Sequence, residues 1–215
     1  MPKNPVISNN KIIMLIAFVC CALMTSLFVY HMSHKQELTV FSDGNATLFP
    51  FARDIKNFKL ASTKAADFSQ KNLAEHWTLA FFGFTHCATI CPATLDMLNH
   101  AYALLHPTYP DLQVVLISLD PNRDSIDKLA AYMASFNPDF IGAAGKLQDI
   151  RKLQSQFGIF SAEDTASDKA NYQLQHTPSI LLIDPHGKWA GIIKPNLSPA
   201  QFAETFKAMT ASHHV

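Results

Sequence analysis

Residues 81–92 read Phe81-Phe82-Gly83-Phe84-Thr85-His86-Cys87-Ala88-Thr89-Ile90-Cys91-Pro92. An apolar, aromatic run stops at two cysteines that stand four positions apart, and a proline follows them directly. The run 77–84 is typical of a buried strand. Pro92 suits the first turn of a helix, and apolar residues recur at helical spacing from there to Pro107. The sequence therefore predicts a strand, a cysteine-containing turn and a helix, in that order.

The rest of the chain continues this alternation of strands and helices. The expected elements are strands over 112–119, 140–143, 179–183 and 188–193, helices over 124–136, over 147–157 and from Ser198 onward, and a loop or hairpin over 161–171. Such an order predicts an α/β sheet covered by helices. Because a strand leads through a cysteine-containing turn into a helix, we expect a thioredoxin-like fold.

Length and composition limit the possible classes of protein. The chain has 215 residues, which suffice for one domain and an extension. Hydrophobic residues make up 48% and charged residues 16%, so a packed core is expected and disorder is not. Basic and acidic residues balance at 17 each, which leaves no basic field to attract nucleic acid.

The N-terminal residues differ from the rest. Residues 12–30 carry no charge, and this length is close to the ~20 residues that a membrane-spanning helix needs. Lys3 and Lys11 precede the run, so the positive-inside tendency places the N-terminus in the cytoplasm. We expect a cytoplasmic N-terminus (1–11), a transmembrane anchor (12–30), a linker (31–50) and a domain (51–215) on the periplasmic side of a bacterial inner membrane.

Two other interpretations of the N-terminal run are less favoured. A cleaved signal peptide needs a small-x-small site, and none follows the run before His31. A lipoprotein would carry its lipid on Cys20, but the bulky Phe18 and Val19 precede that cysteine. Within an uncleaved anchor, Cys20 and Cys21 are expected to be inert apolar residues.

Cys87 and Cys91 are then the two cysteines of the exported part. A disulfide that closes so short a loop would constrain the unfolded chain little, so a purely structural bridge is disfavoured. A helix N-terminus favours a thiolate, and both sulfurs could share one helical face if the first turn includes Cys87. Thioredoxin-type redox pairs keep two intervening residues, and the wider spacing suits a metal chelate better. Electron transfer and metal binding both stay open.

A metal held by two thiolates needs a further ligand. Soft thiolates favour Cu(I), and imidazole suits copper as well. His176 precedes the strand 179–183, whose entry faces the cysteine turn in a thioredoxin-like sheet, and it is the best third ligand. His86 adjoins Cys87, but strand geometry directs its side chain away. The other histidines are expected at the surface: His76, His100, His106, His186, His213 and His214.

At these residues the chain resembles the Sco (SenC) copper chaperones. The stretch 81–95, FFGFTHCATICPATL, is similar to the family signature of an aromatic run, Thr-His-Cys, three residues and Cys-Pro. Residues 117–124, ISLDPNRD, are similar to the family's Ser-x-Asp-Pro-x-Arg-Asp element. His176 falls where the family has its copper-binding histidine, before a strand that ends in a Asp-Pro-His-Gly turn at 184–187. The resemblance covers about residues 50–210.

The resemblance implies a thioredoxin-like domain that binds copper, as Cu(I) or Cu(II), through Cys87, Cys91 and His176. It also implies a role in maturing the copper centre of cytochrome c oxidase. The protein would deliver copper to the copper-bearing subunit or another copper or thiol protein, reduce its cysteines, or do both.

Two departures from the family pattern bear on this function. Ala88-Thr89-Ile90 lacks the acidic residue that the family usually has between its cysteines. The common Asp-His-Ser is replaced by Gln175-His176-Thr177, followed by Pro178. Thr177-Pro178 resembles the cis-proline element of thioredoxins, which favours thiol exchange.

Three hypotheses stay open, and a copper metallochaperone leads. A thiol-disulfide oxidoreductase would use Cys87 as the attacking thiolate with Cys91, and would not need His176. A peroxide-reducing or redox-sensing protein ranks last, with Arg123 as its candidate activating residue. Asp120, Arg123 and Asp124 either hold a loop, with Asp124 as helix N-cap, or act near the copper.

Overall fold

The computed structural model describes residues 9–33, 38–164 and 172–213. The chain divides into two units, residues 1–37 and 38–215, and each is described by itself. In the first unit, the uncharged run predicted as an anchor lies within one helix, α1 (Asn9–Ser33). Among the described residues, no helix combines the length and apolar character that crossing a membrane requires. The predicted transmembrane span is therefore not confirmed.

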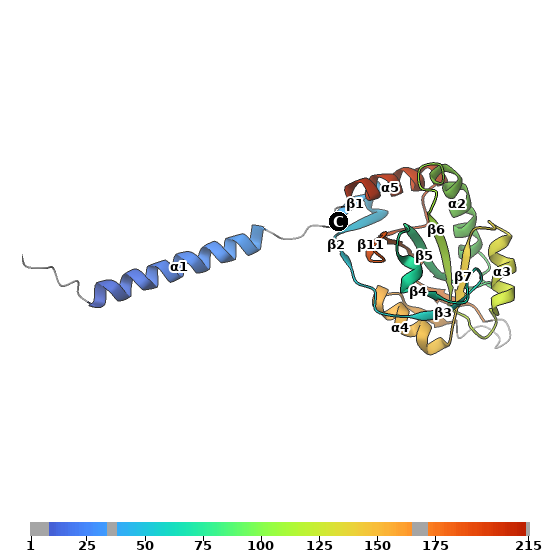
Figure 1. Cartoon of the computed structure of the whole chain (residues 1–215), viewed down its shortest axis with the longest axis horizontal. Helices are drawn as coiled ribbons and strands as arrows, with labels where there is room; N and C mark the ends of the chain where they lie inside the picture. Colours follow the sequence, from blue (N-terminus) through green and yellow to red (C-terminus); the bar gives the residue numbers. More distant parts are fainter. Residues whose placement is uncertain (1–8, 34–37, 165–171, 214–215) are drawn as a thin grey trace, which may run out of the picture. The chain divides into compact units, whose positions relative to one another are not determined.

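The second unit is built on a mixed sheet, drawn in Figure 1. Its strand order is β1-β2-β11-β10-β5-β6-β7-β3-β4 among the described residues. The strands are β1 (Thr39–Phe41), β2 (Ala46–Arg53), β3 (Lys59–Ser62), β4 (Phe68–Ser69), β5 (Thr78–Gly83), β6 (Gln113–Ser118), β7 (Ile141–Ala144), β10 (Ile180–Ile183) and β11 (Trp189–Ile193). Strands β5, β6 and β7 run parallel, and the other pairs are antiparallel. The central strands are buried on both faces because helices cover both.

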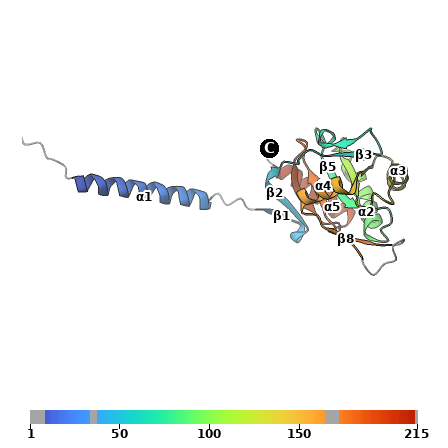
Figure 2. The same cartoon turned by 90° about the horizontal axis from the view of Figure 1, so that it is seen from below.

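Four helices cover this sheet: α2 (Ile90–Leu105), α3 (Ile126–Ala134), α4 (Leu147–Phe157) and α5 (Pro199–Ser212). Apolar residues of α2, α3 and α5 form one core cluster, and those of α4 form a second core cluster with β3, β4 and the opposite side of the central strands. Figures 1 and 2 show α2 and α5 along one side of the sheet and α4 on the other. The expected α/β architecture of a sheet covered by helices is confirmed.

A two-stranded hairpin stands apart from this sheet. It consists of β8 (Ser161–Glu163) and β9 (Leu174–His176), with Ser161 opposite His176. The sequence predicted a loop or hairpin here, and residues 165–171 lie outside the described residues. The hairpin matters for function because its last residue is His176.

Two boundaries differ from the sequence predictions. Residues 31–50 were expected to be a linker, but β1 and most of β2 lie within that range and pair with each other, and β2 also pairs with β11. The polar turn around Asp43-Gly44 gave this part the composition of a linker. The helix expected from Pro92 begins at Ile90, so Cys91 is its second residue.

Candidate metal centre

Cys87 lies in the turn that joins β5 to α2. Its backbone N–H donates to the carbonyl of Phe84 (3.2 Å), which closes the turn directly after the strand. The first turn of α2 does not include Cys87, so the condition under which both sulfurs would share one helical face is not met. Instead, the Cys91 N–H, which lacks a partner within the helix, donates to the Cys87 Sγ (3.4 Å). The Cys87 sulfur therefore sits over the start of α2, next to Cys91.

Cys91 is buried, with 1% of its surface exposed. Burial raises the pKa of the Cys91 thiol well above its ordinary value, because desolvation disfavours the thiolate. The thiol is therefore protonated at neutral pH, and a metal that binds it must displace a proton. Both Cys87 and Cys91 are free cysteines in this structure.

Gly83, the last residue of β5, makes room for the Cys91 sulfur. A Cβ atom at this position would lie 2.9 Å from Cys91 Sγ and 2.8 Å from Leu116 Cδ1, closer than real Cβ contacts come. The glycine in the quoted stretch is thus required by the close approach of α2 to the strand end.

His176 reaches the same sulfur from the hairpin. Its Nε2 lies 3.8 Å from Cys91 Sγ, and its Nδ1 lies 3.2 Å from the carbonyl of Thr177. A carbonyl accepts only, so Nδ1 carries the proton and Nε2 keeps its lone pair toward Cys91. Burial lowers the pKa of His176 below its ordinary value, so the ring stays neutral at neutral pH. A neutral imidazole with a free Nε2 is the form that binds a metal.

The distances suit two ligands of one metal ion. Sulfur and imidazole nitrogen bound at about 2.3 and 2.0 Å lie ~3.5–3.8 Å apart at tetrahedral to trigonal angles, and the observed separation is 3.8 Å. Two sulfurs and one imidazole are a soft donor set of the kind that copper prefers. The structure thus brings Cys91 and His176 to the spacing of two ligands of one ion. Among the described residues, the ligand atoms of Cys87, Cys91 and His176 do not all lie within 4.8 Å of one another, so Cys87 has to move closer to complete a copper site.

The recess beside these residues is small. It is lined by Phe81, Phe82, Ile90, Cys91, Thr94, His176, Pro178, Ser179, Ile180 and Pro195, and its volume is about 10 Å³. That is about the room that a single water molecule needs. The site is shaped for an ion or for the sulfur of another protein, and is too small for an organic substrate.

The Thr177–Pro178 peptide bond is trans, because the described residues contain no cis peptide bond. The resemblance of Thr177-Pro178 to the cis-proline element of thioredoxins therefore does not extend to the geometry of the bond. The cysteine pair itself is the feature that continues to favour thiol exchange.

Asp124 ties the cysteine turn to the end of β6. Its buried carboxylate accepts hydrogen bonds from the Thr85 N–H (3.1 Å), the Thr85 hydroxyl (2.5 Å) and the Ser118 hydroxyl (2.6 Å). The prediction that Asp124 caps α3 is wrong, because Ser125 is the N-cap and accepts from the Lys128 N–H. Asp120 forms an ion pair with Arg123 in the same loop.

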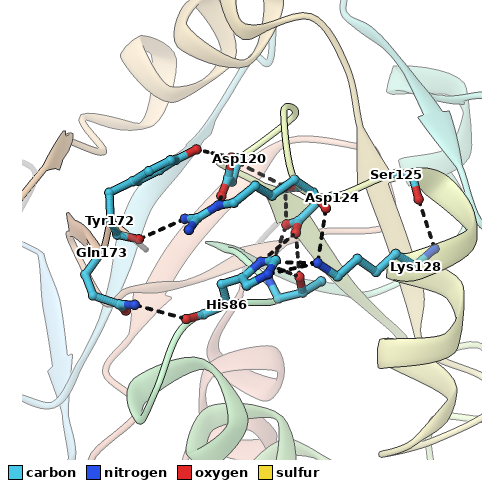
Figure 3. A network of polar contacts seen from close by, with 10 residues as sticks. His86, Asp120, Asp124, Ser125, Lys128, Tyr172 and Gln173 are labelled. Carbon is cyan, nitrogen blue, oxygen red and sulfur yellow. Dashed lines mark hydrogen bonds and ion pairs between the residues drawn. The ribbon is translucent and has the colours of Figure 1, made fainter. Parts of the chain in front are cut away.

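A second group of possible metal ligands lies beside this carboxylate (Figure 3). His86, Asp120 and Asp124 bring ligand atoms within 4.8 Å of one another. Asp120 is already paired with Arg123, and the Lys128 ammonium lies 3.1 Å from the His86 ring. The positive charges of Arg123 and Lys128 thus stand where a bound cation would otherwise be needed. The group is therefore a structural network of polar contacts.

His76 was expected at the surface, but it is half-buried and its Nδ1 is shielded from water. His100, His106 and His186 are exposed as predicted, and His214 lies outside the described residues. His213 was expected in a solvated tail, but its side chain is 4% exposed and pairs with Asp184 at 3.0 Å. Its ring packs against Trp77, a tertiary contact that the local sequence does not reveal.

Fold and site together define a class of protein: a thioredoxin-like domain whose cysteine turn faces a histidine from a separate hairpin. Comparison with known proteins assigns the family. The family model described as SCO1/SenC matches residues 50–211, and the chain belongs to this family.

Curated relatives agree with this assignment. A SCO2-like protein of Rickettsia prowazekii is 31% identical over 151 residues, which cover 70% of this chain and 74% of that protein. A protein of Stutzerimonas stutzeri that carries the name copper-binding protein is also 31% identical, over 74% of this chain and 78% of its own length.

Solved structures agree as well. The copper-bound ScoI of Arabidopsis thaliana has a TM-score of 0.69 at 25% identity, covering 74% of this chain and 100% of that chain. BsSco, described as a member of the Sco family of cytochrome c oxidase assembly proteins with a disulfide switch, has a TM-score of 0.59 at 19% identity, over 76% of this chain and 96% of its own, and supports the fold alone. The family thus includes copper-binding and cytochrome c oxidase assembly proteins.

Proposed function

We propose that this protein is a copper metallochaperone that binds one copper ion through Cys87, Cys91 and His176. One observation carries the proposal: the unprotonated Nε2 of His176 faces the Cys91 sulfur at 3.8 Å, while Nδ1 is held by the Thr177 carbonyl. A second-layer hydrogen bond of this kind orients metal-binding histidines and fixes their tautomer.

The partner follows from the family and from the chemistry of the site. The protein would hand copper to the copper-bearing subunit of cytochrome c oxidase, or to another copper or thiol protein, and helps to assemble that copper centre. The ligands are soft and partly accessible, since Cys87 is partly exposed whereas Cys91 is buried. Such a site allows an incoming thiolate to reach the ion by way of Cys87.

The test is a titration of the reduced full-length chain in detergent with Cu(I) against a competing chelator. The variants Cys87→Ser, Cys91→Ser and His176→Ala should each weaken binding by more than about 100-fold, because each removes a ligand. Cys20→Ser and His100→Ala serve as matched controls, since both side chains are exposed. Parent-like binding by both cysteine variants would refute the proposal.

Thiol-disulfide exchange is the second candidate function. Its support is the contact between the Cys91 N–H and the Cys87 sulfur, which places a partly exposed thiol beside a buried one. Cys87 would attack a client disulfide, and Cys91 would resolve the mixed disulfide. His176→Ala separates the two functions: it should abolish tight copper binding and change the rate of thiol exchange only mildly.

We also propose that residues 12–30 attach the protein to a bacterial inner membrane, with the copper-binding domain on the periplasmic side. The support is the absence of charge in this run, the preceding Lys3 and Lys11, and the exposure of the large apolar side chains along α1. Cell fractionation of the full chain beside a chain lacking residues 1–30 tests this. Recovery of the full chain in the supernatant after osmotic shock would contradict it.

A further inference from the structure

In the part of the chain that the structure describes, the strand that carries His176 has no backbone pairing with the large sheet, although Leu174 packs against the second core cluster and the His176 ring packs against Phe84. Strand β9 pairs with β8 and with no strand of the large sheet among the described residues. At its end, the Thr177 N–H donates to the carbonyl of Phe160, a bond within the same hairpin. The ladder of the large sheet therefore does not fix the distance between the His176 ring and the cysteines.

Polar contacts at the start of β9 attach the hairpin to the domain. The Tyr172 hydroxyl donates to Asp120 Oδ1 (2.6 Å), and Arg123 Nη2 donates to the Tyr172 carbonyl (2.9 Å). The Arg123 guanidinium also lies 3.5 Å from the centre of the Tyr172 ring and is paired with Asp120. We call Asp120, Arg123 and Tyr172 the clamp; Figure 3 shows Tyr172 reaching toward Asp120.

The clamp is largely shielded from water. The side chain of Asp120 is 1% exposed and that of Arg123 is 15% exposed. Hydrogen bonds to charged groups are stronger than those between neutral groups, and shielded ones are screened little by salt. Burial and the neighbouring Asp120 raise the pKa of Tyr172 to about 12, so its hydroxyl keeps the proton that it donates.

A further bond joins the same segment to the cysteine turn. Gln173 Nε2 donates to the carbonyl of His86 (3.3 Å), the residue directly before Cys87. Residues 172 and 173 thus contact both the loop after β6 and the turn that carries Cys87. His176 follows them by three or four residues along an extended strand, so a shift of this segment moves the imidazole.

We propose that Asp120, Arg123 and Tyr172 are positioning residues, which hold the His176 hairpin against the cysteine turn and so set the copper affinity without touching the ion. This inference rests on the proposed function. Asp120 and Arg123 of the 117–124 motif would thus act by holding the hairpin. Asp124 has a different role, because it ties the cysteine turn to β6.

Tyr172→Phe tests the inference, because it removes the bond to Asp120 and keeps the ring beneath Arg123. We expect Cu(I) affinity of the full-length chain to fall about tenfold, the equivalent of one hydrogen bond to a charged group. Tyr109→Phe is the matched control: its hydroxyl bonds Thr210 at 2.8 Å, on α5. The control should change copper affinity less than about twofold while losing a similar bond.

The same substitution in a His176→Ala background gives the deciding comparison. If the clamp acts through His176, Tyr172→Phe should then have no further effect on affinity, within about twofold. In the parent background it should also shift the sulfur-to-Cu(II) charge-transfer absorption, which a loss of global stability would not do. Gln173→Ala removes only the bond to His86, so it should lower copper affinity less than Tyr172→Phe does. It replaces Tyr172→Phe in this comparison if that variant does not fold.

An equal loss of affinity in both backgrounds would overturn the inference, as would a parent-like affinity of both Tyr172→Phe and Gln173→Ala. In either case the proposed function stands as long as His176→Ala alone weakens binding. If His176→Ala alone has no effect, the ligand set itself is wrong, and the inference falls with it.

Discussion

Replacing Gly83 by alanine should displace the Cys91 sulfur and so weaken copper binding. The added Cβ would lie 2.9 Å from Cys91 Sγ and 2.8 Å from Leu116 Cδ1, whereas ordinary contacts begin at 3.4 Å. The two atoms must therefore move by about 0.5 and 0.6 Å. The leucine methyl is the end of a flexible chain, but the sulfur is one bond from the Cβ of a residue in the first turn of α2 and can move only with it.

The magnitude follows from these contacts. Overpacking of this kind destabilises a protein by about 1–3 kcal/mol. Since two contacts of similar length share the strain, about half of it falls on Cys91. Copper binding needs the sulfur at its native distance from His176 Nε2, so restoring that distance costs ~0.5–1.5 kcal/mol, or a loss of about two- to tenfold in affinity.

Urea unfolding and Cu(I) competition titration of the same preparations measure both effects. Gly142→Ala is the control, because its Cβ would lie 2.5 Å from Leu129 Cγ, in the contact between β7 and α3. We expect Gly142→Ala to be at least as destabilising and to leave copper affinity unchanged. If Gly83→Ala weakened copper binding no more than Gly142→Ala does, the reasoning would be refuted.

Three further predictions concern the same site. Copper affinity should fall at least tenfold per pH unit on acidification from pH 8 to 7, because the raised pKa of Cys91 keeps that thiol protonated and binding must release its proton. The slope should steepen further only below about 6.5, since burial lowers the pKa of His176, and a flat profile in chelator competition would contradict this. Iodoacetamide should modify Cys87 well before the buried Cys91, and peptide mapping that gives the reverse order would disprove the assigned accessibility. Asp124→Ala should cost ~3 kcal/mol or more by denaturant unfolding, because three donors lose an acceptor that is itself buried, and Asp124→Asn should cost less.

The parts of the fold that the sequence predicted well are those with strong local signals. The apolar runs 77–84 and 112–119 contain β5 and β6, and the amphipathic spacing over 147–157 coincides with α4. His176 could be placed near the cysteines because a buried strand follows it directly, and the entry of that strand lies beside the cysteine turn in such a fold.

The parts that it missed depend on tertiary contacts between polar residues. Strand β1 has three residues, and β2 follows it across a polar turn, so the composition of this part resembles that of a linker. Nothing near Tyr172 in the chain indicates that its hydroxyl bonds Asp120, 52 positions earlier. His213 is buried only because Asp184 and Trp77 meet it there. Such pairings carry no periodic signal and become visible only in three dimensions.

The fold holds the three proposed ligands to different degrees, so copper should leave them in a particular order. Cys91 can leave its place only if the first turn of α2 unwinds. The two-stranded hairpin pairs with no strand of the large sheet among the described residues, and it is held by polar bonds and by the packing of Leu174 and His176. An ion on its way out should thus part from the imidazole first and remain two-coordinate on sulfur, open to an incoming donor at the partly exposed Cys87. The off-rate would then follow the opening of the hairpin, and an acceptor protein could speed the transfer simply by displacing it.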